Sequence, residues 1–237
     1  MTIKIREINE IQLESLESLC DCSLFNYGTM RDLCNKYSCK LVKGKTYGII
    51  GEFGAGGWAL SYTLAGKEND YDGIIRINGQ VVNSQILRKI SCYVGEDPIP
   101  KSLFNNKKRL IINRLKDGIK LGKSPIDDIE EIIQVFGLSH ERLNRIIENI
   151  SNERWRASMA IGYTWGKKIY CFPWLNTGNL IFLKDYILPC ITYLKQKGSI
   201  IIIPTCKIDI IKDIIDEAFF IKSHFEESYN SMESNED

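Results

Sequence analysis

A glycine-rich stretch, GEFGAGGWALS at residues 51–61, directly follows an apolar run that ends in KTYGIIG. The apolar run predicts a short buried strand and WALSYTLAG predicts the start of a helix, so the glycines form a tight turn between the two. A second apolar run, SIIIIPT, is bounded by Gly and Pro, which is typical of a parallel strand covered on both faces. These patterns restrict the chain to an α/β fold built on a parallel sheet.

The remaining segments alternate between strand and helix patterns. Strands are predicted at TIKIREI, KISCYVG, KIYCF and DEAFFIK, and the Asn-Gly turn of GIIRINGQVV predicts an antiparallel hairpin. Helical spacing from Lys101 to about Asn149 predicts a helical subdomain at about 101–160, and LIFLKDYILPCITYLKQKG predicts a later helix. We expect residues 1–225 to form one unit and the polar, acidic residues 226–237 to be a flexible tail.

Charge and hydropathy exclude several kinds of protein. The chain carries 31 Lys and Arg against 30 Asp and Glu, so it has no global field that would attract nucleic acid or an anionic bilayer. No apolar stretch approaches the length of a membrane span, and the N-terminal residues lack the apolar core of a secretory signal. We therefore expect a cytoplasmic protein.

The cysteines do not form the pattern of a metal site. Cys20, Cys22, Cys34 and Cys39 have the spacings CxC and C-x4-C without a nearby His, whereas structural zinc sites generally use CxxC pairs. The other four lie in apolar segments, where a free thiol behaves as a small hydrophobic group: Cys92, Cys171, Cys190 and Cys206. We predict no bound metal and thiols that are buried and reduced.

A basic stretch lies in the predicted helical subdomain, and the acidic IDDIEE follows it. A solvated face with i,i+4 ion pairs accounts for such a run, although basic residues there could also approach anionic headgroups. Aromatic residues are not interleaved with the charges as a base-stacking surface requires, so we expect no nucleic-acid partner. The basic residues are Lys101, Lys107, Lys108, Arg109, Arg114, Lys116, Lys120 and Lys123.

The order of these segments resembles the ATP-binding subunit of ABC transporters along nearly the whole chain. The family's phosphate-binding loop, Walker A, reads GxxGxGK[ST]. Its framework is matched by Gly51, Gly54, Ala55 and Gly56. Gly57 stands in place of the Lys that reaches the phosphates, and Trp58 stands in place of the hydroxyl that binds Mg²⁺. The resemblance implies a loop that keeps only its cradle of backbone N–H groups. Tight packing of the glycines without any ligand is the alternative.

The resemblance also implies the architecture: a RecA-like P-loop core with an antiparallel β subdomain and an inserted α-helical subdomain. The segment GIIRINGQ is similar to the family's hairpin SGEILINGK. Tyr27, in LFNYGT, falls where the family places an aromatic residue that stacks on adenine. Glu96, in CYVGED, occupies the Q-loop position of the Gln that senses magnesium and the attacking water. A carboxylate there would repel a γ-phosphate that lacks compensating cations.

The motifs in the second half of the family pattern are altered at their chemical positions too. In ISNERWRASMAIG, the counterpart of the signature LSGGQ, Ser151 fits the start, whereas Asn152 and Glu153 replace the flexible glycine pair and its surroundings. Glu153 is expected to place a negative charge there. Of the remaining motifs, Pro173 and Trp174 stand in place of the Walker B Asp and the Glu that polarises water, and Cys206 replaces the switch His.

These joint replacements predict a degenerate ABC transporter ATP-binding subunit without hydrolysis, a pseudo-ATPase. Removal of one electrostatic stabiliser typically costs about 10² to 10³ in rate, and here the Lys, the hydroxyl, the Asp, the Glu and the His are all replaced. We expect Trp58 and Trp174 to plug the vacated pocket. No cofactor is therefore expected, and binding of ATP without Mg²⁺ is the less favoured alternative.

The resemblance implies a membrane-spanning permease subunit as partner, together with a homodimer or a heterodimer with an intact ABC ATPase. The chain would then lie at the inner face of the cell membrane through its partner, as a structural or regulatory half. Two other functions stay open at this point. One is a stand-alone interaction or regulatory protein that reuses the fold. The other is an atypical active ATPase that recruits relocated residues such as Lys67, Glu96 or Asp97.

Overall fold

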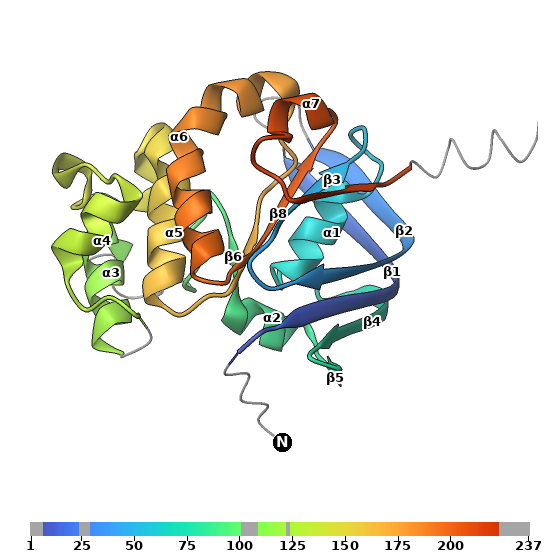
Figure 1. The fold of residues 1–237 in the computed structure, drawn as a ribbon, viewed down its shortest axis with the longest axis horizontal. Coiled ribbons are helices and arrows are strands. Elements are labelled where there is room, and N and C mark those ends of the chain that lie inside the picture. The colour runs from blue at the N-terminus through green and yellow to red at the C-terminus, as the bar shows by residue number, and fades with distance from the viewer. Residues whose placement is uncertain (1–6, 24–28, 101–108, 122–123, 223–237) are drawn as a thin grey trace, which may run out of the picture.

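Two β-sheets of different kinds organise the molecule (Figure 1). The computed structural model describes residues 7–23, 29–100, 109–121 and 124–222. The antiparallel sheet has the order β2-β1-β4-β5 and the parallel sheet the order β6-β7-β8-β3-β9. The antiparallel strands are β1 (Glu10–Ser23), β2 (Thr29–Val42), β4 (Tyr71–Ile77) and β5 (Gln80–Val81). The parallel strands are β3 (Thr46–Ile50), β6 (Ser91–Tyr93), β7 (Ile169–Cys171), β8 (Ile200–Thr205) and β9 (Glu217–Phe220).

The parallel sheet lies between two apolar layers. Every residue of β3 and β8 is buried, which confirms the strands predicted from the apolar runs. Successive side chains of a strand point to opposite faces. Accordingly, Ile200 and Ile202 join the cluster formed with the antiparallel sheet and α1 (Gly57–Leu64), whereas Ile201 and Ile203 join the cluster on the helical side. The two faces of one short strand therefore hold both halves of the core together.

The antiparallel sheet contains one predicted hairpin and one that was not predicted. The β4–β5 turn places both Asn78 and Gly79 at positive φ, 50° and 79°, as the predicted Asn-Gly turn requires. The long β1–β2 pair was not predicted. Residues 2–6 of the predicted strand TIKIREI lie outside the described ranges, and the strand prediction is wrong for Glu7 and Ile8, because β1 begins only at Glu10.

The described residues between β6 and β7 are mainly helical. They lie on the face of the parallel sheet opposite the antiparallel sheet (Figure 1). In this segment the structure describes α3 (Ile111–Lys120), α4 (Ile129–Phe136), α5 (Arg154–Thr164) and short 3-10 turns at His140–Arg142, Ile147–Asn149 and Ser151–Glu153. The other helices are α2 (Ser84–Ile90), α6 (Thr177–Gln196) and α7 (Ile208–Ile211). Among the described residues, no helix has the length and apolar content needed to cross a membrane.

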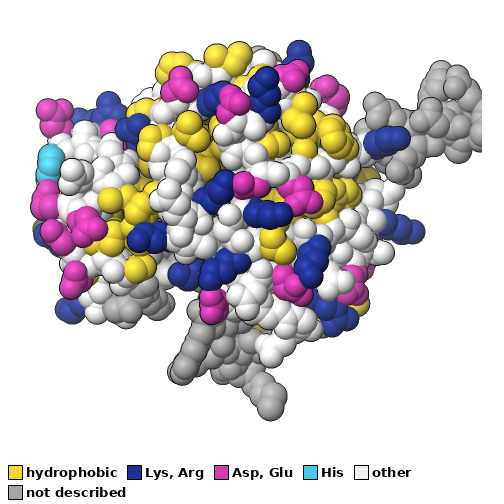
Figure 2. Space-filling view, in the orientation of Figure 1, with side chains coloured by type: hydrophobic (Ala, Val, Ile, Leu, Met, Phe, Trp, Pro, Cys, Tyr) yellow, Lys and Arg dark blue, Asp and Glu magenta, His cyan; other side chains and the backbone are white. Residues whose placement is uncertain are grey.

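The charged surface differs in part from the sequence expectation. Figure 2 shows basic and acidic side chains interspersed over the face in view, in keeping with a net charge of +1. The basic residues of this stretch that the structure describes do not all lie on a solvated face. Arg114 is only 5% exposed and pairs with Asp97 at 2.9 Å. Lys101, Lys107, Lys108 and Lys123, like the acidic tail, lie outside the described residues.

The cysteines behave largely as predicted. Cys92, Cys171 and Cys190 are buried and free, and burial raises the pKa of the Cys92 thiol to about 11 and that of Cys190 to about 12. Cys206 is free and half-buried. Cys20 is disulfide-bonded, so a prediction of reduced thiols is wrong for this residue.

Candidate functional site

The glycine-rich loop lies between β3 and α1, at the carboxyl end of the parallel sheet, where α/β proteins commonly bind ligands. Gly54 and Gly56 adopt positive φ values of 90° and 101°, a backbone conformation that L side chains rarely adopt. A Cβ atom on Gly56 would lie 2.5 Å from the Cα of Cys34 and 2.5 Å from the carbonyl oxygen of Leu33. The loop therefore packs directly on the backbone of β2.

A buried carboxylate from β2 contacts the backbone of this loop. Oδ1 of Asp32 accepts a hydrogen bond from the N–H of Gly56 at 3.0 Å, and Oδ2 accepts one from the N–H of Ala59 at 2.8 Å. Asp32 is 1% exposed. Burial raises the pKa of Asp32, and hydrogen bonds from the loop backbone oppose this rise. Sequence reasoning missed Asp32.

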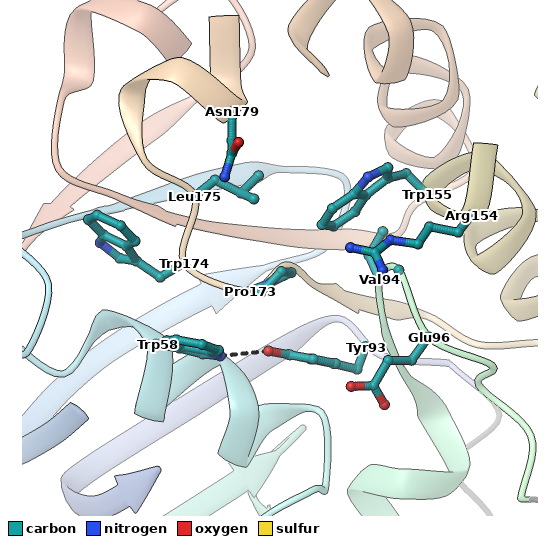
Figure 3. A pocket seen from close by; sticks show the side chains of 11 residues that line it. Trp58, Tyr93, Val94, Glu96, Arg154, Trp155, Pro173, Trp174, Leu175 and Asn179 are labelled. Carbon is teal, nitrogen blue, oxygen red and sulfur yellow. Dashed lines mark hydrogen bonds between the residues drawn. The ribbon is translucent and has the colours of Figure 1, made fainter. Parts of the chain in front are cut away.

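The side chain at the second replaced position of the loop is buried beneath the pocket. Trp58 is 4% exposed, and its indole Nε1–H donates to the hydroxyl of Tyr93 at 2.6 Å (Figure 3). The ring of Phe53 packs edge-on against the Trp58 ring, with centroids 5.8 Å apart. A buried indole therefore stands at the position where the family resemblance implies a metal-binding hydroxyl. Burial also raises the pKa of the Tyr93 hydroxyl well above its ordinary value.

A second tryptophan fastens the segment after β7 to the same loop. The indole Nε1–H of Trp174 donates to the carbonyl oxygen of Gly51 at 3.3 Å. The ring of Phe53 also lies edge-on to the Trp174 ring, with centroids 5.3 Å apart. Phe53 thus bridges the two tryptophans, and the loop is held by aromatic contacts from both sides.

These elements enclose a pocket of about 340 Å³. Four residues from three motifs line it (Figure 3): Trp58 of Walker A, Glu96 of the Q-loop, and Pro173 and Trp174 of Walker B. The structure adds lining residues that were not predicted, among them Tyr93, Arg154 and Trp155. The described lining residues are largely aromatic or apolar, a surface that suits packing better than coordination of phosphate and magnesium.

Glu96 lies at the rim of this pocket with a compensating cation. Its Oε2 lies 2.5 Å from Nζ of Lys67, which also lies 5.7 Å from the ring centroid of Tyr93. The carboxylate is therefore already neutralised by an ion pair. Lys67 lies just after the end of α1, and it contacts Glu96 and the Tyr93 ring at the rim of the pocket.

The signature counterpart does not present its acidic residue as expected. Glu153 is 6% exposed, and its carboxylate accepts hydrogen bonds from the backbone N–H and the hydroxyl of Ser139. It also pairs with Arg142 at 3.1 Å. The carboxylate of Glu153 is therefore buried and paired within the helical segment and is not exposed at the motif.

The remaining predicted residues lie apart from the pocket lining or outside the described chain. Ser151 has a φ of 50° and is exposed, as is Asn152. Sγ of Cys206 lies 3.5 Å from Oγ1 of Thr177 at the start of α6. Tyr27 is outside the described residues. The pocket is thus built mainly from the loop, β6 and the segment after β7.

Comparison with known proteins gives consistent matches. The profile of the ABC transporter family matches residues 34–169. An uncharacterized ABC transporter ATP-binding protein of Methanocaldococcus jannaschii is 21% identical over 219 residues, which cover 89% of this chain and 76% of that protein.

Solved structures share the architecture. A nucleotide-free ATP-binding cassette from an ABC transporter aligns with a TM-score of 0.60 at 16% identity, over 91% of this chain and 88% of that one. The protein cbiO1 of Clostridium perfringens, part of an ABC transporter complex, aligns with a TM-score of 0.58 at 16% identity, over 96% and 93%. These similarities confirm the predicted fold: a P-loop core with a parallel sheet, an antiparallel β subdomain and an inserted helical subdomain.

Proposed function

Because this chain belongs to the ABC transporter family, we propose that it is an ATP-binding-cassette subunit that does not hydrolyse ATP. It serves as the structural or regulatory half of a transporter assembly. The proposal joins the family assignment to the state of the loop, where a glycine and a buried tryptophan occupy the positions of the Lys and the metal-binding hydroxyl.

The indole of Trp58 is the observation that carries the proposal. It is nearly fully buried and hydrogen-bonded to Tyr93 at 2.6 Å, so it cannot leave without breaking that bond and exposing apolar surface. Phosphoryl transfer needs Mg²⁺ and a cationic side chain at the developing charge. The aromatic ring supplies neither, and the indole of Trp174 lines the same pocket from the segment after β7.

Exposed apolar residues at the start of α6 support a proposed interface with a partner subunit. Ile181 and Phe182, in the first turns of α6, are 62% and 69% exposed, and hydrophobic side chains are visible over α6 at the upper edge of the view in Figure 2. They directly follow LNTGNL at residues 175–180, which stands where the resemblance places the family's dimer-facing loop. The proposal is a dimer, with a second copy or an intact ABC ATPase, docked on a membrane-spanning permease.

Phosphate release is the test of the lost hydrolysis. The purified chain is incubated with Mg²⁺ and ATP beside an intact ABC ATPase as the positive control, and no release above background is expected. A Trp58→Ala variant separates true activity from a contaminant. Release from the unmodified chain that changes in rate in this variant would overturn the proposal, whereas equal release from both preparations identifies a contaminant.

The dimer is tested by sedimentation of the unmodified chain beside a Phe182→Ser variant, alone and mixed with an intact ABC ATPase. The substitution removes an exposed ring and should weaken association. It should not lower the free energy of unfolding, because the ring is mostly outside the core. Equal association of both forms would contradict the proposed interface.

A further inference from the structure

We propose that Asp32 is an internal substitute for phosphate: its carboxylate occupies the anion-binding cradle of the glycine-rich loop and holds the loop folded without nucleotide. This inference rests on the proposed function, since only a subunit that does not use ATP can leave this cradle to a side chain. It assigns a ligand to the loop, and that ligand is part of the chain.

Both oxygens of the carboxylate are engaged by the loop and the helix that follows it. Oδ1 accepts from Gly56 at 3.0 Å and Oδ2 from Ala59 at 2.8 Å. In a phosphate-binding loop, such backbone N–H groups cradle the phosphates. The two bonds therefore fill donors that a nucleotide would need.

The amino end of α1 provides the electrostatic attraction. Backbone N–H groups at the start of a helix are unsatisfied within the helix and carry partial positive charge. The N-cap residue of α1 is Gly56, which offers no side-chain acceptor, and the first turn of α1 contains no acidic residue. Asp32 supplies the missing negative charge from a different element.

The neighbouring strand fixes the carboxylate in place. Asp32 pairs with Cys20 across the long β1–β2 ladder, and the absence of a Cβ on Gly56 lets the loop approach the backbone of residues 33 and 34 closely. With 1% of Asp32 exposed, solvent has little access to the carboxylate. A phosphate on the same N–H groups would meet this negative charge at short range, so the two anions exclude each other.

Chemical rescue distinguishes a phosphate substitute from an ordinary helix cap. An Asp32→Ala variant removes the carboxylate and leaves the cradle open. Its melting temperature is expected to fall by several degrees and to recover in a concentration-dependent manner with inorganic pyrophosphate, while the unmodified chain gains nothing. Sodium chloride at equal ionic strength controls for screening.

Two matched variants accompany this experiment. Asp21→Ala removes an exposed carboxylate on β1 that pairs with Arg31, and pyrophosphate should not affect it specifically. Asp32→Asn keeps the volume of the side chain in the cradle, so pyrophosphate should not stabilise it. Absence of rescue in Asp32→Ala, or equal stabilisation of Asp32→Ala and the unmodified chain, would overturn the inference.

If the Asp32→Ala variant does not fold, the unmodified chain still decides the question. The amide signals of Gly56 and Ala59 in a ¹H–¹⁵N spectrum should stay unshifted at millimolar pyrophosphate, and shifts at both amides would refute an occupied cradle. The two proposals fail separately. ATP hydrolysis by the unmodified chain overturns the proposed function, whereas missing rescue without hydrolysis overturns only the role of Asp32.

Discussion

At the scale of single residues, the hydrogen bond between Trp58 and Tyr93 fixes one wall of the pocket. Both side chains are buried, and a buried indole N–H without an acceptor costs about 1–3 kcal/mol. The pair is therefore a specific contact as well as a way to fill space, and its contribution can be separated from packing by substitution.

We predict that Tyr93→Phe lowers the free energy of unfolding by about 1–3 kcal/mol, because it leaves the indole N–H of Trp58 without its acceptor. Trp58→Ala should cost about 3–5 kcal/mol through lost packing. Urea denaturation of both variants and of the double variant measures the coupling. Tyr62→Phe, in a ring that packs edge-on against Tyr93, is the control. Additive single effects would contradict the hydrogen bond.

The buried carboxylate gives a prediction about pH. Burial raises the folded-state pKa of Asp32 above its ordinary value of 3.8. Burial therefore favours the protonated form of Asp32 in the folded chain, so ionisation lowers the free energy of unfolding as the pH rises through the folded-state pKa, and the hydrogen bonds from the loop backbone offset part of this loss. The Asp32→Asn variant is neutral throughout, so the stability of the unmodified chain relative to this variant should fall as the pH rises above 3.8.

Urea denaturation of both proteins at a series of pH values checks this expectation. Both chains share all other titrating groups, so the difference between them isolates residue 32. A relative stability that rises with pH would mean that the loop lowers the pKa of Asp32 below its ordinary value of 3.8.

At the scale of elements, the close approach of the loop to β2 makes one glycine far less replaceable than another. Gly56→Ala would place its Cβ 2.5 Å from backbone atoms of β2, whereas Gly79→Ala in the β4–β5 turn would meet nothing within 4 Å. Both residues have positive φ, so both substitutions carry the strain of the left-handed conformation, about 1–2 kcal/mol.

We expect only Gly56→Ala to add the steric cost of moving β2 away from the loop. The difference in the free energy of unfolding between the two variants, measured with urea, isolates this cost. Equal destabilisation by the two substitutions would show that the loop and β2 separate easily.

The elements also show what the sequence could predict and what it could not. The strands β3 and β8 are continuous apolar runs, and the β4–β5 turn is Asn-Gly, so local patterns were sufficient. The strands β1 and β2 carry many charged residues along their exposed face. These charges obscure the alternation of apolar and polar residues that would predict a strand. The available signal for this strand was the pair Asp32 and Cys34, which lie two residues apart on the inward side of β2 and are both buried.

The candidate site was predictable only in part for the same reason. Motif spacing brought Glu96, Pro173, Trp174 and Trp58 to one pocket, because each follows a strand or opens a helix at the same edge of the sheet. The partners of Asp32 and Glu153 depend on how separate elements pack. Asp32 and Gly56 are 24 residues apart, and no local pattern specifies that contact.

At the scale of the whole molecule, a buried ion pair joins the helical segment to the parallel sheet. Asp97 follows β6 and Arg114 lies on α3, and the side chains are each 6% exposed. The Arg114 guanidinium also donates to the carbonyl oxygen of Pro100 at 3.2 Å. This contact therefore fixes the helical segment on the sheet at a point where solvent does not weaken it.

We predict that Arg114→Met lowers the free energy of unfolding by about 3–5 kcal/mol, because Asp97 is left buried without its partner. The matched control is Arg31→Met on β2, whose partner is the exposed Asp21 and whose loss should cost less than about 1 kcal/mol. Urea denaturation of both variants measures the two costs. Comparable effects at both pairs would contradict a specific anchor.

The carboxylate in the loop has a consequence for how this subunit responds to its surroundings. A protein that binds a ligand only when folded gains stability as the ligand concentration rises. A group fixed on an adjoining strand has an effective concentration on the order of millimolar or higher, so dissolved nucleotide competes with it poorly. If both proposals hold, the folding equilibrium of this chain is uncoupled from the energy charge of the cell, and the timing of transport comes from the proposed partners.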